Sequence, residues 1–381
     1  MIPYGKQSIN QQDIDAVVNV LKSDFLTQGP VVKKFEEAVA DYCGAQYGVA
    51  VNSATSALHL ACLALGVSKG DVVWTSPISF VASANCALYC GADVDFVDID
   101  ERTYNLSAEK LKDKLLNHKN NNKPLPKVVI PVHLAGQSCD MEELYKLSME
   151  YDFKIIEDAS HSMGAKYQSQ TVGNCRFSDI TVFSFHPVKI ITTAEGGLAT
   201  TNDRNISHRM KLLRSHGITR DENIMTEESH GLWYYQQIEL GYNFRMTELQ
   251  AALGLSQLER VSIMIKERSE ISKLYNNEFK SLPITIPFQN ENTNSSWHLY
   301  IIQVDEKSHK KVFDSLRGNG IGVNLHYIPI NSQPYYRRKY GSFTLPVSEG
   351  YYKKSISLPL YHGMSKQDQN SVVVGVKSIF K

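Results

Sequence analysis

The feature that most constrains this chain is the alternation of short β-branched runs with stretches of helical periodicity. The runs lie at residues 47–51, 72–75, 94–97, 128–132, 154–156, 180–183 and 198–200. Helical stretches between them end at glycines such as Gly66 and Gly91. Parallel strands need such crossover connections, so the alternation predicts an α/β fold with a mostly parallel central sheet and helices on both faces.

The pattern changes on either side of this alternating region. Apolar residues at helical spacing follow Asn10 and again precede Gly44, which predicts two helices before the sheet. After Met246 we expect one long amphipathic helix reaching Phe279. Beyond it the sequence predicts strands at residues 299–304 and 323–326 and helices near 311–316 and 367–380.

The length of 381 residues exceeds the size at which one hydrophobic core usually stops growing. We therefore expect three parts: an N-terminal segment with a large domain over residues 1–245, a long connecting helix over 246–280, and a small C-terminal α/β domain over 281–381.

Composition excludes several classes of protein. Forty basic and forty acidic side chains cancel without long runs of either sign, which argues against nucleic acid or an anionic membrane as a partner and favours small molecules. The six cysteines form no CxxC pair and the histidines do not cluster, so neither structural zinc nor a disulfide framework is expected. The amino terminus lacks signal-peptide features, and no apolar stretch approaches ~20 residues. We expect a soluble protein of the reducing cytoplasm.

The first strand is followed by NSATSAL, residues 52–58, in which small hydroxyl residues open a helix. Free N–H groups at such a helix start can hold a phosphate. Ordinary helix capping is the alternative for these side chains. Because GxGxxG is missing at this turn, a single phosphate is favoured over the pyrophosphate of a dinucleotide.

Two further strand ends carry candidate ligand-binding groups, because ligands of parallel sheets sit at the carboxyl ends of the strands. Phe80 follows the second strand, where its ring can cover a flat heterocycle or simply join the core. In KIIEDASHSMGA, Asp158 can pair with a protonated pyridine nitrogen, whereas Glu157 is expected to cap or to be solvated. His161 can bond a cofactor oxygen or be an ordinary structural histidine.

The segment FSFHPVKIITTAEGG places Lys189 five residues after Ser184, at the end of another strand. A lone lysine is usually a solvated charge. Beside a phosphate site and Asp158, however, the economical interpretation is a lysine that forms a Schiff base, its amine made nucleophilic by partial desolvation. Lys189 would release the cofactor to an amino donor and then shuttle a proton, while Ser184 would add a hydroxyl to the phosphate.

Taken together, these segments resemble the DegT/StrS-type sugar aminotransferases of the fold-type I pyridoxal-phosphate superfamily. The resemblance runs from IPYGKQSI through GYNFRMTELQAALGLSQL to LHYIPI, nearly end to end. It implies pyridoxal 5′-phosphate as cofactor and a homodimer. It also implies these positions: Lys189 as the Schiff-base lysine, Asp158 at the pyridinium nitrogen, His161 near the ring hydroxyl, Phe80 over the ring, Thr55, Ser56 and Ser184 at the phosphate, and Asn243 reaching the phosphate from the partner subunit.

Within the family, TSPISFVA, DASHSMGA and RSHGI are most similar to members that aminate C4 of a UDP-linked 4-keto-6-deoxy-N-acetylhexosamine on the way to pseudaminic acid. This resemblance implies L-glutamate as amino donor. It implies sugar-nucleotide contacts at Tyr4, Asp24, Phe25, Leu26, Thr27, Ser56, Asn243, Asn324, Leu325, His326 and Tyr327. The chain departs from many members at His161, where they carry glutamine.

Three alternatives stay open. Relatives that remove a sugar hydroxyl carry histidine in place of the lysine, so Lys189 favours transamination. An aminotransferase for another UDP- or dTDP-linked keto sugar would keep the chemistry and change only the pocket. A sugar-nucleotide sensor without activity would use the same scaffold, because a fold does not fix function. Arg214 and Arg245 are candidates for the diphosphate, with surface salt bridges as the alternative for each.

Overall fold

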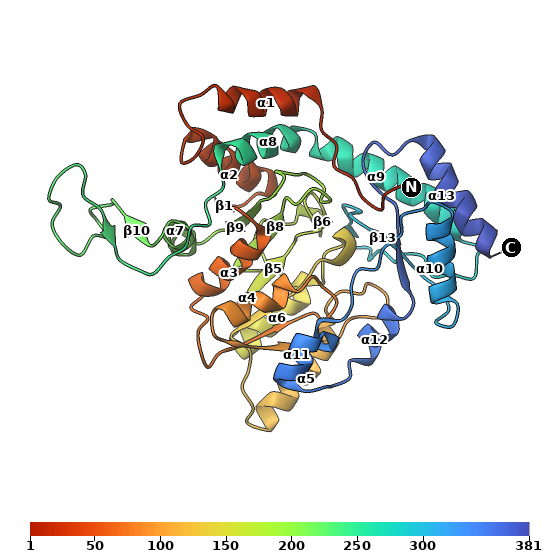
Figure 1. Ribbon diagram of the computed structural model, residues 1–381. Helices are drawn as coiled ribbons and strands as arrows, with labels where there is room; N and C mark the ends of the chain where they lie inside the picture. Colours follow the sequence, from red (N-terminus) through yellow and green to blue (C-terminus); the bar gives the residue numbers. More distant parts are fainter. Residues whose placement is uncertain (381) are drawn as a thin grey trace.

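In the computed structural model, which describes residues 1–380, seven strands form one central sheet (Figure 1). Their order across the sheet is β1-β9-β8-β5-β4-β2-β3. The strands are β1 Tyr47–Val51, β2 Val72–Thr75, β3 Asp93–Phe96, β4 Val128–Ile130, β5 Lys154–Asp158, β8 Ile180–Ser184 and β9 Gly197–Thr201. β9 pairs antiparallel with both of its neighbours, β1 and β8, and all other neighbouring strands of this sheet pair parallel. The predicted α/β class with a mostly parallel sheet is therefore confirmed.

Helices cover both faces of the sheet because successive strand residues point to opposite sides. Val49 and Val182 pack in the core beneath α3 (Ala54–Ala64), α4 (Ala82–Tyr89) and α7 (Arg204–Leu213), whereas the adjacent Ala50 and Phe183 pack in the core on the opposite side. That opposite side is covered by α2 (Pro30–Cys43) and α8 (Glu248–Glu259) at one end of the sheet and by α5 (Ala108–Asn120) and α6 (Met141–Tyr151) at the other.

The expected single helix after Met246 is divided in two. α8 ends at Glu259 and α9 (Val261–Phe279) begins after Arg260, whose φ of −105° and ψ of 1° interrupt the helix. The break lies where α1 (Gln11–Leu21) packs on α8 (Figure 1). Fully buried Asp13 of α1 accepts hydrogen bonds there from Ser256, Gln257 and Arg260. The expectation of one continuous helix was wrong because tertiary contacts fix a bend that periodicity does not encode.

The C-terminal part has its own core. β13 (Tyr300–Gln303) and β14 (Ser355–Leu358) pair antiparallel, and α10 (His309–Gly318), α13 (Lys366–Ile379) and α9 pack with them. The strand expected at residues 323–326 is not formed. Asn324 makes a single bridge to Ser357, after which the chain turns toward the large cavity described below. The division at residues 245 and 280 stays a prediction.

The remaining elements are short. They are η1 Leu134–Gly136, η2 Ile330–Ser332, α11 Pro334–Tyr340, α12 Pro346–Tyr352, and the small strands β6 Lys166–Tyr167, β7 Gln170–Thr171, β10 Ile218–Thr219, β11 Gln236–Gln237 and β12 Thr293–Asn294. β10 and β11 form an arm that projects from the body of the molecule (Figure 1). Leu232 and Trp233, in the segment that connects β10 to β11, are 100% and 74% exposed. No helix in the described part of the chain is both long and apolar enough to cross a bilayer.

Candidate active site

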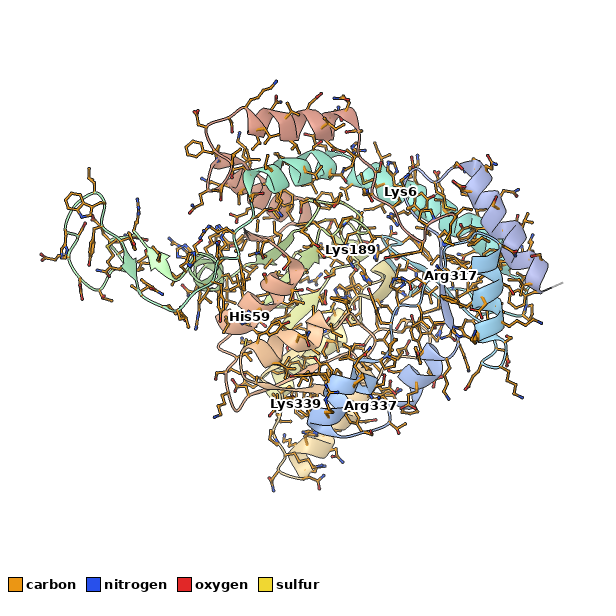
Figure 2. All side chains as sticks on the ribbon, in the orientation of Figure 1. Lys6, His59, Lys189, Arg317, Arg337 and Lys339 are labelled. Carbon is orange, nitrogen blue, oxygen red and sulfur yellow. The ribbon has the colours of Figure 1, made fainter. Side chains whose placement is uncertain are left out.

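A cavity of about 590 Å³, called the main cavity below, opens at the carboxyl ends of the parallel strands. It lies between the sheet and the segment 324–327, and Figure 2 labels Lys189 near the centre of the view. Eleven of the residues predicted for the site line it: Tyr4, Thr55, Phe80, Asp158, His161, Ser184, Lys189, Asn324, Leu325, His326 and Tyr327. Segments far apart in sequence thus meet in one place, as the rule for parallel sheets requires.

The first corner of the main cavity is the start of α3. Ser53 is the N-cap, and its hydroxyl accepts a hydrogen bond from the Ser56 N–H at 3.1 Å. Ser56 turns its own hydroxyl to Asn52 Oδ1 at 2.7 Å, so it supports the cap and does not line the cavity. Thr55 and Ser53 do line it. The first amides of a helix have no partners within the helix, so this corner suits a phosphate.

The second glycine of TTAEGG, Gly197 on β9, stands where the fold leaves no room for a side chain. A Cβ at this position would lie 2.5 Å from the Ser53 carbonyl carbon and 2.5 Å from the Ala54 nitrogen. Any larger residue would therefore push the start of α3 off the sheet. The register pairs Gly197 with Ser184 of β8, so the same contact holds the start of α3 close to Ser184, the third hydroxyl of this corner.

The side chains of Glu157 and Asp158, at the end of β5, point to opposite faces of the sheet. The carboxylate of Asp158 is buried, lines the cavity and accepts hydrogen bonds from Ser83 Oγ at 2.6 Å and the Ser160 N–H at 3.1 Å. Glu157 points away and bonds His133 at 2.7 Å. Burial alone would lower the pKa of His133, but hydrogen bonds with Cys139 and Glu157 raise it to about 10. The expectation that Glu157 is solvated or capping was wrong, because it is buried and hydrogen-bonded to His133, Ser178 and Thr181.

The Lys189 amine has no hydrogen-bond or ion-pair partner among residues 1–380. Burial lowers its pKa to about 8, and the opposite charge of Asp158 raises it in part. A substantial fraction of the amine is therefore neutral near physiological pH, which is the form that attacks a carbonyl carbon.

His161 is held in one tautomer by its contacts. Its Nδ1 accepts a hydrogen bond from the Ala135 N–H at 3.3 Å, and its Nε2 lies 3.1 Å from the Tyr327 hydroxyl. Burial and the charges of Lys189 and His326 hold the pKa of His161 well below its usual value. The neutral ring therefore carries its proton on Nε2 and donates it to Tyr327 Oη, which leaves the Tyr327 proton free for the cavity.

The open side of the main cavity is aromatic. Phe80 is 61% exposed at the cavity wall, and its ring centroid lies 6.4 Å from that of Tyr327. An exposed flat ring beside a free amine and a buried carboxylate fits a planar heterocycle. The ring of Tyr4 packs against that of His326, with centroids 5.1 Å apart and planes tilted by 52°, and the Tyr4 carbonyl accepts a hydrogen bond from the Leu360 N–H, which anchors the amino terminus.

Sequence reasoning missed several residues of the main cavity: Ser79, Ser160, His186, Glu195 and His298. His298 is the most informative of them. It is 4% exposed, its ring lies 4.3 Å from that of His161, and neither ring nitrogen has a hydrogen-bond partner in the described chain. It follows an irregular segment before β13, so no strand-end motif marked it. Ser160 was the easier to find, because it lies two residues after Asp158.

The remaining predicted residues lie elsewhere in the chain. Asp24, Phe25, Leu26, Thr27 and Asn243 are all exposed and lie outside the main cavity. Bridges join Thr27 to Thr247 and Asn243 to Ser215, which places both segments beside a second cavity of about 260 Å³. We call it the basic cavity, since its lining includes Lys33, Arg214 and Arg245.

The two candidate arginines of the basic cavity differ in their contacts. Arg214 forms an ion pair with Glu36 and donates to the Ala50 carbonyl at 2.6 Å, so its charge is already compensated. Arg245 has no ion-pair partner within residues 1–380. Of these two arginines, Arg245 is therefore the one free to meet an anionic ligand at this cavity.

Comparison with known proteins agrees with this geometry. Residues 7–377 match the DegT/DnrJ/EryC1/StrS aminotransferase family. The chain is 38% identical to the UDP-4-amino-4,6-dideoxy-N-acetyl-beta-L-altrosamine transaminase of Campylobacter jejuni, over 98% of this chain and 96% of that protein. It is 37% identical to the spore coat polysaccharide biosynthesis protein SpsC of Bacillus subtilis, over 100% and 97%.

A solved structure shows the same likeness in three dimensions. Helicobacter pylori PseC, an aminotransferase involved in the biosynthesis of pseudoaminic acid, superposes with a TM-score of 0.91 at 33% identity, covering 100% of this chain and 99% of that one. The main cavity offers a free lysine amine, a buried carboxylate, a helix start and an exposed aromatic ring, all of which fit pyridoxal 5′-phosphate. The chain belongs to the DegT/DnrJ/EryC1/StrS aminotransferase family and is an aminotransferase that uses pyridoxal 5′-phosphate.

Proposed function

We propose that this enzyme transfers the amino group of L-glutamate to C4 of a UDP-linked 4-keto-6-deoxy-N-acetylhexosamine, in the biosynthesis of pseudaminic acid. The observation that carries the proposal is the full-length likeness to the Campylobacter jejuni transaminase and to Helicobacter pylori PseC. The hydroxyl groups on the wall of the main cavity support it, because such groups bind sugar hydroxyls and amides. The six free cysteines suit a reducing cytoplasm, where we place the reaction.

In this proposal the cofactor acts as an electron sink, and the side chains bind, orient and move protons. Lys189 would hold the cofactor, and its free amine would move a proton to or from the donor carbon of the substrate. Asp158 would keep the ring nitrogen protonated, and His161 would bind the ring hydroxyl. Phe80 would cover the ring, while Thr55 and Ser184 would bind the phosphate together with the start of α3.

Tyr327 and its neighbours form the sugar end of the site. The Tyr327 hydroxyl accepts from His161 and keeps its own proton. Burial, with the charges of Tyr4 and Asp158, raises the pKa of Tyr327, so the phenol stays a donor at physiological pH. Asn324, Leu325, His326 and Tyr4 complete this end.

We also propose a homodimer with shared sites. Lys189 is the only lysine or arginine lining the main cavity in residues 1–380, although the cofactor phosphate, the glutamate carboxylates and a UDP diphosphate would bring several negative charges. The unpaired Arg245, the exposed Asn243 and residues 24–27 gather instead at the basic cavity. An isologous dimer can place each chain's basic cavity against the partner's main cavity, so that both sites are completed by the same contact.

The decisive experiment offers purified enzyme and glutamate a panel of UDP- and dTDP-linked 4-keto sugars, followed by identification of the amino sugar. We expect preferential conversion of the UDP-linked 4-keto-6-deoxy-N-acetylhexosamine, with the new amine at C4. Preference for a dTDP sugar, or amination elsewhere, would refute the proposed substrate and leave the aminotransferase chemistry standing.

A second candidate is an aminotransferase for another keto sugar, favoured by the 37% identity with SpsC. The panel separates the two. A sensor without activity is distinguished earlier, by whether glutamate discharges the visible absorption of the bound cofactor.

A further inference from the structure

Two serines that no strand-end motif marked lie behind the carboxylate of Asp158. Ser83 Oγ is 2.6 Å from Asp158 Oδ2, and Ser79 Oγ is 2.7 Å from Ser83 Oγ. All three side chains are buried. Serines at the start of a helix usually serve as caps, but the N-cap of α4, Val81, makes no side-chain cap bond. These hydroxyls therefore need another explanation.

The contacts show which hydroxyl is the donor in each of the two hydrogen bonds. Ser83 has a single proton, and the nearest and only charged acceptor is Asp158; the Phe80 carbonyl is farther, at 3.3 Å. A hydroxyl proton goes to a carboxylate in preference to a neutral oxygen, because charge-assisted hydrogen bonds are stronger. The Ser79 contact must then be a donation to Ser83 Oγ. The result is a relay from Ser79 through Ser83 to Asp158, in which each bond strengthens the next.

The relay binds Oδ2 of Asp158, the carboxylate oxygen that accepts no hydrogen bond from the backbone. The Ser160 N–H binds Oδ1, and Ser83 binds Oδ2, so Asp158 cannot rotate without losing a donor. Both partners are donors, which favours the ionised carboxylate. Ser79 also lines the main cavity beside Phe80, whereas Ser83 lies behind the wall. One five-residue segment therefore presents the aromatic ring and fixes the acid.

We propose that Ser79 and Ser83 form a positioning relay that holds Asp158 ionised and aimed at the ring nitrogen of the cofactor, so that the shared proton resides on that nitrogen. This inference rests on the proposed role of Asp158. Removal of the Ser83 hydroxyl takes a donor from the carboxylate, and Asp158 then takes a larger share of the proton. The cofactor becomes a weaker electron sink.

The test uses two measurements on the complete enzyme other than turnover. Nitrogen NMR of cofactor labelled at the ring nitrogen reports its protonation, and equilibrium titration gives the dissociation constant of the cofactor. Ser83→Ala is expected to move the nitrogen signal toward the unprotonated position and to weaken cofactor binding about tenfold, the effect of one lost hydrogen bond to a charged group. Ser79→Ala should shift the signal the same way by a smaller amount.

Three further variants make the result decisive. Ser207→Ala removes a buried hydroxyl that has no hydrogen-bond partner and should leave both readouts unchanged. Ser83→Thr keeps a hydroxyl on the same Cβ and should return the signal toward that of the unaltered enzyme, which a space-filling role would not do. A Ser83→Ala or Ser79→Ala signal identical to wild type, while Asp158→Asn shifts it, overturns the relay. An unchanged signal in Asp158→Asn would instead overturn the proposed role of Asp158 itself.

Discussion

The main cavity and the basic cavity are built differently. In the main cavity, buried groups such as Asp158 and His161 are fixed by hydrogen bonds within one chain. Beside the basic cavity, Asn243 is exposed and Arg245 lacks an ion-pair partner in residues 1–380. The difference teaches that the buried polar groups of the main cavity are preorganised by the fold of one chain, whereas the polar groups beside the basic cavity lie at the surface, where the proposed function assigns them to an anionic substrate. The predictions below test that division.

The largest effect is expected at the reacting amine. Lys189→Ala should reduce single-turnover transamination by at least about 10³-fold while leaving the melting temperature near wild type, because no neighbouring amine can carry the proton. Lys69→Ala, at an exposed lysine outside the lining of the main cavity, is the matched control. Near-normal transamination by the Lys189 variant would contradict the assignment of the reaction to the main cavity.

Asp158→Asn should still bind the cofactor but lower kcat by about 10²-fold, since the amide cannot keep the ring nitrogen protonated. Steady-state kinetics for both half-reactions measure this. If only the sugar KM changed, Asp158 would belong to substrate binding.

The division between cavities predicts complementation between subunits. Lys189→Ala and Asn243→Ala homodimers should each be impaired. If the two residues of one site come from different chains, each mixed dimer has one doubly altered and one intact site. Its activity should then approach half that of wild type. No recovery after verified subunit exchange would place Asn243 and Lys189 in the same chain's site.

The lowered pKa of Lys189 predicts a pH dependence. The neutral amine predominates above about 8, compared with 10.5 for an ordinary lysine. The rate at which added cofactor attaches to cofactor-free protein should therefore rise about tenfold between roughly pH 7 and 9 and then level off. A rate still rising steeply above pH 10 would mean that the amine is not desolvated.

The smallest effect is expected at the sugar end. Tyr327→Phe should raise the sugar KM about fivefold, the loss of one neutral hydrogen bond, with little effect on the glutamate half-reaction. An equal loss of rate in both half-reactions would mean that Tyr327 contacts the cofactor and not the sugar.

Much of this arrangement was readable before the fold was known. A parallel sheet brings its strand ends together, so residues after different strands, such as Thr55, Phe80 and Lys189, were expected to be neighbours, and they line one cavity. Ser83 was not found, because its partner lies 75 residues away and serines at a helix start resemble caps. His298 follows irregular chain, where no periodicity exists to interpret.

The sequence by itself determined the α/β class and which residues follow the strands, because periodicity and local chemistry depend only on neighbours along the chain. Tertiary structure alone decided how those residues are used. It turned Asp158 into the cavity and Glu157 into a buried pair with His133, since adjacent residues of a strand face opposite sides of the sheet. Tertiary structure also placed Asn243 outside the main cavity. Packing between segments that are distant in sequence decides this position, and the local sequence pattern does not.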